Sequence, residues 1–299
     1  MRRRSVVPVL AVLSLASAAS MMAGCAKSST SAAGSTAPVS APAGSSSPTA
    51  DPCSPSQLQT LTAGTLTIAT SKPAYPPYII DDNPSSGKGY ESAVAYAVAQ
   101  HLGYAQSAVK WVTASFDEAI KPGTKNFDFD INQVSINADR QKVVDFSTPY
   151  LQASQGVVAL KGSKAAAATT LADLKKLKFG VQVGTTSLSI LEAVVAPTQQ
   201  PQVFGSTVDP TVALKNHQID ALVADLPTSD YIANVELSNG LIVGQLPPQG
   251  TPENWGLVLA KNSPLTTCVS KAVSALSDAG TLTALQKQWL PFVSVKTFS

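Results

Sequence analysis

The chain has 299 residues, of which 13% are charged, and its net charge is +2. Three of its arginines, Arg2, Arg3 and Arg4, stand at the very beginning, so that without residues 1–24 the net charge becomes −1. The remainder lacks the basic patch or stripe that a nucleic-acid partner requires.

The first 25 residues have the organisation of an export signal. After the three arginines comes an apolar stretch, residues 6–19, which is shorter than the ~20 residues of a transmembrane helix. Met22-Ala23-Gly24-Cys25 then resembles the bacterial lipobox, which implies cleavage before Cys25 and a lipid on that residue. We therefore expect an exported protein, anchored by the lipid at the outer face of the cytoplasmic membrane. The alternative is an ordinary signal peptide with an incidental Cys.

Residues 25–56 follow the signal and are expected to form a flexible, lipid-anchored linker. Ser, Ala, Thr, Gly and Pro dominate residues 26–56, and such a composition cannot bury a core. Residues 57–299 are left as the folded part. Disulfides persist outside the membrane, so Cys53 and Cys268 are predicted to form a bridge. Two free buried thiols are the alternative.

The folded part alternates between strand-like and helix-like segments. Strands are predicted from β-branched and alternating residues over 66–70, 109–112, 127–136, 157–160, 179–183, 203–204, 219–223 and 255–260. Helices are predicted over 89–103, from 116 to 120, from 170 to 174, after Gly184, over 210–215, and twice within 265–290. This alternation predicts an α/β fold with parallel sheets.

The chain offers little for catalysis or metal binding. His101 and His217 both fall in predicted helices, away from any motif, and no Cys/His cluster has the spacing of a zinc site. Asp81-Asp82-Asn83 lacks the remainder of a calcium loop and is better explained as a turn. We therefore expect no metal and no cofactor.

Other residues are suited to hold a small zwitterion. Arg140 can pair bidentately with a carboxylate. Gly184, between a strand and a helix, allows an anion to approach free backbone N–H groups. Asp225 lies just past a predicted strand end, where ligands of open α/β sheets bind, and could accept an ammonium group. Apolar walls could come from three aromatic residues, Tyr75, Tyr78 and Phe116.

A series of motifs along the chain strengthens this interpretation. In order they are Tyr75-Pro76-Pro77-Tyr78, Gly89-Tyr90-Glu91, Phe127-Asp128, Ser135 with Arg140, residues 144–150, residues 180–186, residues 219–225, Gly280-Thr281-Leu282 and Lys287-Gln288-Trp289. The series resembles the polar amino-acid-binding subunits of bacterial ABC importers over nearly all of residues 60–292. The resemblance implies a non-catalytic receptor that delivers an amino acid to a membrane permease.

The resemblance also implies roles for particular residues. Arg140 would bind the ligand carboxylate, and Asp225 the α-ammonium group. The remaining expected ligand-binding residues are the backbone donors Thr185 and Thr186 beside Gly184, the strand residues Ser135 and Gln133, the aromatic pair Tyr75 and Phe116, and Asp130 on the pocket floor. Asp130 to Gln133 depart from the small residues usual in the family, and we expect them to set the side-chain preference. Asn132, Ser71, Lys72 and Glu253 are further candidates for that role.

The implied fold has two α/β lobes of the type II periplasmic-binding-protein class, joined by two crossing strands. Lobe one would comprise residues 57–152 and 249–299, and lobe two residues 153–248. The crossings would lie near Leu151-Gln152 and Pro247-Pro248, and the protein would be a monomer. Two alternatives remain open. One is a dehydratase-like enzyme that would use Glu91, Asp130 or Glu253 as acid or base. The other is a lipoprotein that senses a ligand for a signalling partner.

Overall fold

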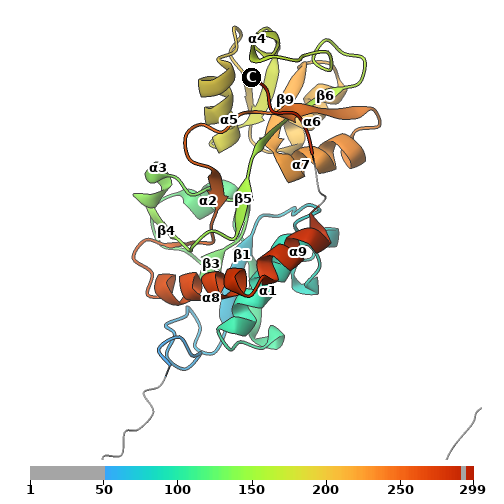
Figure 1. Cartoon of the computed structure of the whole chain (residues 1–299). Coiled ribbons are helices and arrows are strands. Elements are labelled where there is room, and N and C mark those ends of the chain that lie inside the picture. Colours follow the sequence, from blue (N-terminus) through green and yellow to red (C-terminus); the bar gives the residue numbers. More distant parts are fainter. Residues whose placement is uncertain (1–50, 291–293) are drawn as a thin grey trace, which may run out of the picture. The chain divides into compact units, whose positions relative to one another are not determined.

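The computed structural model describes residues 51–290 and 294–299, which all belong to one compact unit (Figure 1). Cys25, the signal and most of the expected linker lie outside these residues. Within the described residues, no helix is both long and apolar enough to cross a membrane.

The first of two five-stranded sheets has the strand order β2-β1-β3-β12-β4. Its strands are β1 (Leu66–Thr70), β2 (Val109–Thr113), β3 (Phe129–Asp130), β4 (Val144–Phe146) and β12 (Val258–Ala260). Strand β1 is parallel to both β2 and β3, whereas β12 runs antiparallel to β3 and β4. All five residues of β1 are buried, as expected for a central strand covered on both faces.

Helices cover both faces of this sheet, and together they form the first lobe. On one face, α1 (Tyr90–His101), α8 (Thr266–Asp278) and α9 (Thr281–Trp289) pack against one another (Figure 1). The short helices α2 (Phe116–Ile120) and α3 (Ala138–Gln141) lie nearer the other sheet. A capping box between Ser115 and Glu118 fixes the start of α2. Gly89 precedes α1 at φ +99°, where an added Cβ would lie 2.3 Å from the Tyr78 carbonyl oxygen.

The second sheet has the order β10-β6-β9-β7-β8 and forms the second lobe with its helices. Its strands are β6 (Gln155–Leu160), β7 (Phe179–Gln182), β8 (Gln202–Phe204), β9 (Ala221–Asp225) and β10 (Gly240–Gln245). Its helices are α4 (Leu171–Leu174), α5 (Thr186–Ile190) continued by a π-helical turn at Leu191–Val195, α6 (Val208–Lys215), and α7 (Leu226–Tyr231) continued by another at Ile232–Glu236. Separate apolar clusters fill its two faces.

Two short strands connect the sheets. β5 (Leu151–Ala153) carries the chain from the first sheet to the second, and β11 (Glu253–Trp255) carries it back. They pair antiparallel, with Gln152 opposite Asn254. β5 includes Leu151 and Gln152, the residues near which the first crossing is expected. The second paired strand begins at Glu253, further along the chain than the predicted Pro247-Pro248.

The end of the chain corrects the predicted boundary of lobe one. Residues 294–299 pack on the second sheet, although α9 belongs to the first lobe. Phe298 is buried in the core of the second lobe, the Ser299 carbonyl accepts a hydrogen bond from Leu171 N at 3.2 Å, and Thr297 bridges to Gln245. Figure 1 shows the C-terminus beside α4. An apolar contact that depends on tertiary packing gives no periodic signal in a six-residue segment.

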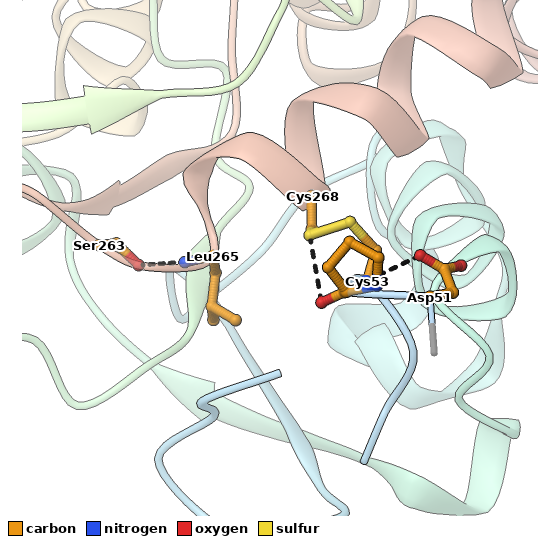
Figure 2. The surroundings of a disulfide bond; sticks show 6 residues. Asp51, Cys53, Ser263, Leu265 and Cys268 are labelled. Carbon is orange, nitrogen blue, oxygen red and sulfur yellow. Dashed lines mark hydrogen bonds between the residues drawn. A yellow bond between two sulfur atoms is a disulfide. The ribbon is translucent and has the colours of Figure 1, made fainter. Parts of the chain in front are cut away.

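A disulfide joins Cys53 to Cys268 in α8, across a sequence separation of 215 residues (Figure 2). The Cys53 N–H donates to the Asp51 carboxylate at 2.9 Å. Cys268 is buried in the core of the first lobe, and Cys53 packs against that core. The bridge therefore lies within one lobe and does not connect the two.

Two predicted strands differ from the structure. Residues 127–136 form a strand only at Phe129–Asp130, because the chain then turns, with Gln133 at φ +51° and its N–H bonded to Glu91 in place of a strand. Residues 255–260 are divided between β11 and β12. Gly256 stands between them, and an added Cβ there would lie 2.9 Å from the Ile136 side chain.

Candidate functional site

A cavity of about 510 Å³ lies where the carboxyl ends of strands from both sheets meet. Thr70 at the end of β1, Gln182 at the end of β7 and Asp225 at the end of β9 all line it. Carboxyl ends of parallel strands are where open α/β sheets bind ligands. Eight of the predicted ligand-binding residues line this cavity: Arg140, Asp225, Thr185, Thr186, Ser135, Gln133, Tyr75 and Phe116.

Arg140 is a cation of the first lobe at this cavity. Its backbone N–H is capped by the Asn137 side chain at the start of α3. Its guanidinium donates to the carbonyl oxygens of Ser135 at 2.6 Å and Gly184 at 3.0 Å. It also lies 5.2 Å from the centre of the Phe116 ring, where a cation–π contact is favourable. Phe116 therefore supports the arginine as well as the cavity wall.

Arg140 is only 7% exposed, yet among the described residues it forms no ion pair. Burial lowers the pKa of Arg140, and the negative charges of Asp225 and Glu253 partly oppose that effect. Carbonyl oxygens hold the planar group without neutralising it. An anionic group that entered the cavity would supply the missing negative charge.

Asp225 is an acid of the second lobe at this cavity. It ends β9 and precedes α7, and Gln155 Nε2 donates to its carboxylate at 2.7 Å. Burial raises the pKa of Asp225 well above its ordinary value, and the charge of Glu253 raises it further. The Gln155 hydrogen bond and the Arg140 charge act in the opposite direction. A ligand cation beside Asp225 would favour the ionised carboxylate.

Gly184 and Thr185 form the turn before α5. The Thr185 hydroxyl donates to the Gln182 carbonyl at 2.8 Å and accepts from Leu188 N at 3.3 Å, so it caps the helix. Gly184 adopts φ +74° and accepts from Arg140, but it does not line the cavity. Its part in the site is thus to hold the arginine.

Asp130 is, with Gly184, one of two predicted site residues that do not line the cavity. Its side chain is completely buried, and neither carboxylate oxygen has a hydrogen-bond partner among the described residues. It lies in β3 opposite Ala69 and Val258, inside the sheet, whereas Asn132 and Gln133 beyond the strand line the cavity. Burial raises the pKa of Asp130 well above its ordinary value, and the nearby Glu91 adds to that shift.

Glu91 is a buried residue that contacts Gln133. Its carboxylate accepts from the Gln133 backbone N–H at 2.8 Å, from the Gln133 side-chain amide, and from the Tyr150 hydroxyl at 2.5 Å. Burial nevertheless raises the pKa of Glu91 to about 7, against the effect of these hydrogen bonds. Glu91 thus fixes the positive-φ conformation of Gln133 and does not itself line the cavity.

Sequence reasoning missed Gln155 altogether. It is a buried polar residue that opens the otherwise apolar strand β6, and this change in polarity was the available signal. Its amide donates to Asp225 and to Glu253, both at 2.7 Å, and its oxygen accepts from Ser187 at 2.6 Å. Another contact between the lobes joins the hydroxyls of Tyr78 and Thr228 at 2.8 Å.

Within residues 51–290 and 294–299, no group of three or more His, Cys, Asp or Glu side chains could hold a metal ion. The site consists of one arginine, one lysine, acids, hydroxyls, amides and aromatic rings. Such a set can bind a small zwitterion through its two charged ends.

The comparisons with known proteins agree with this geometry. Residues 66–292 match the family of bacterial extracellular solute-binding proteins, family 3. The chain belongs to this family, and its fold is that of the two-lobed amino-acid-binding proteins of ABC transporters.

Individual relatives differ in the ligands for which they are named. The L-cystine-binding protein TcyJ of Escherichia coli K12 is 30% identical over 233 residues, which cover 76% of this chain and 82% of the relative. ABC transporter arginine-binding protein 1 of the same organism is 26% identical, over 73% of this chain and 87% of the relative. Both names describe binding proteins.

Among solved structures, the ancestral amino-acid-binding protein AncCDT-1 superposes with a TM-score of 0.63 and 26% identity, over 76% of this chain and 96% of that one. It is described as a precursor of cyclohexadienyl dehydratase. The neighbour is thus itself a binding protein, and the expectation of a receptor in place of an enzyme agrees with all three comparisons.

Proposed function

We propose that the cavity binds one α-amino acid as a zwitterion, and that the loaded receptor presents it to the permease of an ABC importer. The observation that carries this proposal is that Arg140 and Asp225 line one cavity from different lobes. Arg140 would take the α-carboxylate and Asp225 the α-ammonium group. Neither lobe alone holds both charges, so the ligand would stabilise the arrangement in which the lobes are together.

The acids near the cavity favour a polar or cationic ligand side chain. Glu118 and Glu236 line it in addition to Asp225, against Lys72 and Arg140 as cations. Gln133 and Asn132 add amide groups on the first lobe. The arginine-binding and cystine-binding relatives have ligands of this polar kind in their names.

Calorimetric titration with the twenty amino acids and L-cystine tests the proposal. Arg140→Ala should weaken binding of the best ligand by about 2–5 kcal/mol, the scale for truncating one partner of a buried charge pair. Lys142→Ala is the matched control, because Lys142 lies two residues further on and, among the described residues, pairs with the exposed Asp139 alone. Unchanged affinity in Arg140→Ala would place the ligand elsewhere, and silence across the panel would contradict amino-acid binding.

We further propose that a lipid on Cys25 keeps a monomeric receptor at the outer face of the membrane, close to its permease. The support is the lipobox-like sequence Met22-Ala23-Gly24-Cys25. Expression of Cys25→Ser should release the protein into the soluble fraction, while the unchanged chain partitions into detergent. Equal partitioning of both would contradict the anchor without affecting the ligand site.

A further inference from the structure

Glu253 lies behind the cavity wall and organises it. It begins β11, the crossing strand, and its side chain does not line the cavity, in contrast to its neighbours Ser135 and Thr186. Ser135 belongs to the first lobe, and Thr186 is in the first turn of α5 in the second. Oε1 of Glu253 accepts from Ser135 Oγ at 2.6 Å and from Thr186 Oγ1. The two hydroxyl oxygens are themselves 3.2 Å apart.

These three oxygens form a triangle with only two hydrogens. An ionised carboxylate can accept but not donate, and each hydroxyl has a single hydrogen to give. Both hydrogens are used inside the triangle, whether Ser135 donates to Glu253 or to Thr186. Toward the cavity, Ser135 and Thr186 can therefore offer lone pairs only.

The polar side chains next to this triangle likewise have no hydrogen left to donate to a ligand. Both amide hydrogens of Gln155 are used, one on Asp225 and one on Oε2 of Glu253, each at 2.7 Å. The Ser187 hydroxyl, which also lines the cavity, gives its hydrogen to Gln155 Oε1 at 2.6 Å. The side chains on this side of the cavity thus present only acceptors to a ligand. Glu253 is the residue to which this set of hydrogen bonds connects, directly from Ser135, Thr186 and Gln155 and through Gln155 from Ser187.

We propose that Glu253 is a positioning residue that makes this wall accept but not donate, and so selects a protonated α-amine over an α-hydroxyl. The proposal rests on the proposed function, because it concerns the ammonium end of that site. An ammonium group brings only donors and fits such a wall. The hydroxyl of an α-hydroxy acid brings one donor, and its lone pairs would face other lone pairs.

The test compares an amino acid with its hydroxy acid in Glu253→Gln. A glutamine at this position donates through its own amide, so that one hydroxyl hydrogen can turn toward the cavity. The probes are L-arginine with its 2-hydroxy analogue and L-glutamine with its 2-hydroxy analogue; the strongest binder of the calorimetric panel replaces them if neither binds. We divide the dissociation constant of the hydroxy acid by that of the amino acid. In Glu253→Gln this ratio should fall about tenfold or more, which corresponds to one lost hydrogen bond. Glu192→Gln, an exposed glutamate of the second lobe, should leave the ratio unchanged.

A double-mutant cycle separates hydroxyl orientation from the mere loss of a negative charge. In the Ser135→Ala/Thr186→Val background there is no hydroxyl hydrogen to redirect. Glu253→Gln should then change the ratio much less than it does in the unmodified protein. An equal change in both backgrounds, or equal weakening of both ligands by Glu253→Gln, would overturn the proposal.

Neutron diffraction on the unliganded, deuterium-exchanged protein tests the same point without any ligand. Both hydroxyl deuterons should lie inside the triangle of Ser135, Thr186 and Glu253. A deuteron of either hydroxyl directed into the cavity would overturn the proposal. Failure of every amino acid to bind would contradict the proposed function, whereas the deuteron positions would still decide the role of Glu253.

Discussion

Two pairs of acids in this protein, one half-buried and one buried, differ in what surrounds them. Asp225 and Glu253 are at the cavity, where Gln155 donates to both and Arg140 lies nearby. Glu91 and Asp130 are inside the first lobe, and Asp130 has no partner among the described residues. Burial raises the pKa of Asp225, Glu91 and Asp130 alike. A raised pKa therefore does not identify the binding acid here, whereas access to the cavity and a nearby cation do.

The largest expected effect concerns the acid that faces the ligand. Asp225→Asn should weaken amino-acid binding by about 2–5 kcal/mol, because the ligand ammonium loses its charged partner. Burial raises the pKa of Asp225, so acidic solution protonates it, and the affinity of the unmodified protein should fall as the pH falls. The titration series should show a flatter pH dependence for Asp225→Asn. Asp209→Asn, an exposed acid that does not line the cavity, is the control. A steep pH dependence retained in Asp225→Asn would assign the proton to another group.

The second pair, Glu91 and Asp130, should affect stability more than binding, because neither acid lines the cavity. The pKa of Glu91 is raised from 4.5 to about 7 in the folded protein. The folded state then holds the proton more tightly than the unfolded state, so the stabilising contribution is complete below pH 4.5 and is lost as the pH rises through 7. Over this window the free energy of unfolding should fall by about 3 kcal/mol through this group.

Urea denaturation at pH 4.5 and pH 7.5 measures that change. Because Asp130 shifts in the same direction, the comparison is best made in an Asp130→Val background. Glu91→Gln should remove most of the remaining difference between the two pH values, and Glu192→Gln should not. An unchanged difference in Glu91→Gln would show that Glu91 titrates normally.

The smallest expected effect is a gain in stability. Asp130→Val should stabilise the protein by about 1–3 kcal/mol, because a buried carboxyl without partners is replaced by an apolar side chain suited to a strand. Asp128→Val is the contrasting change: the Asp128 carboxylate accepts from Leu61 N at 2.8 Å and Thr67 N at 2.6 Å, and its loss should destabilise. Equal effects of the two substitutions would mean that Asp130 has a partner after all.

The sequence predicts the α/β alternation, because that alternation is a local signal. The family resemblance carried by the motif order implies that Arg140 and Asp225 lie at one site. The sequence does not predict the position of Asp130. A strand of two residues has no alternation from which its inward face could be inferred. Gln155 is equally hidden, since its importance depends on Asp225, 70 residues away in the chain. The sequence also does not predict that Ser135, Thr186 and Ser187 offer only acceptors to the cavity. That property depends on which group each hydroxyl donates to, and those contacts are visible only in the three-dimensional structure.

The return of the last residues to the second sheet has a practical consequence. The final residue, Ser299, is exposed but held to α4 by its carbonyl, whereas Asp278, exposed at the end of α8, belongs to the first lobe. A donor fluorophore at one of these positions and an acceptor at the other would therefore report on the spacing of the two lobes. Neither position lines the cavity, so resonance energy transfer between them could follow ligand capture in a receptor whose site is left chemically intact.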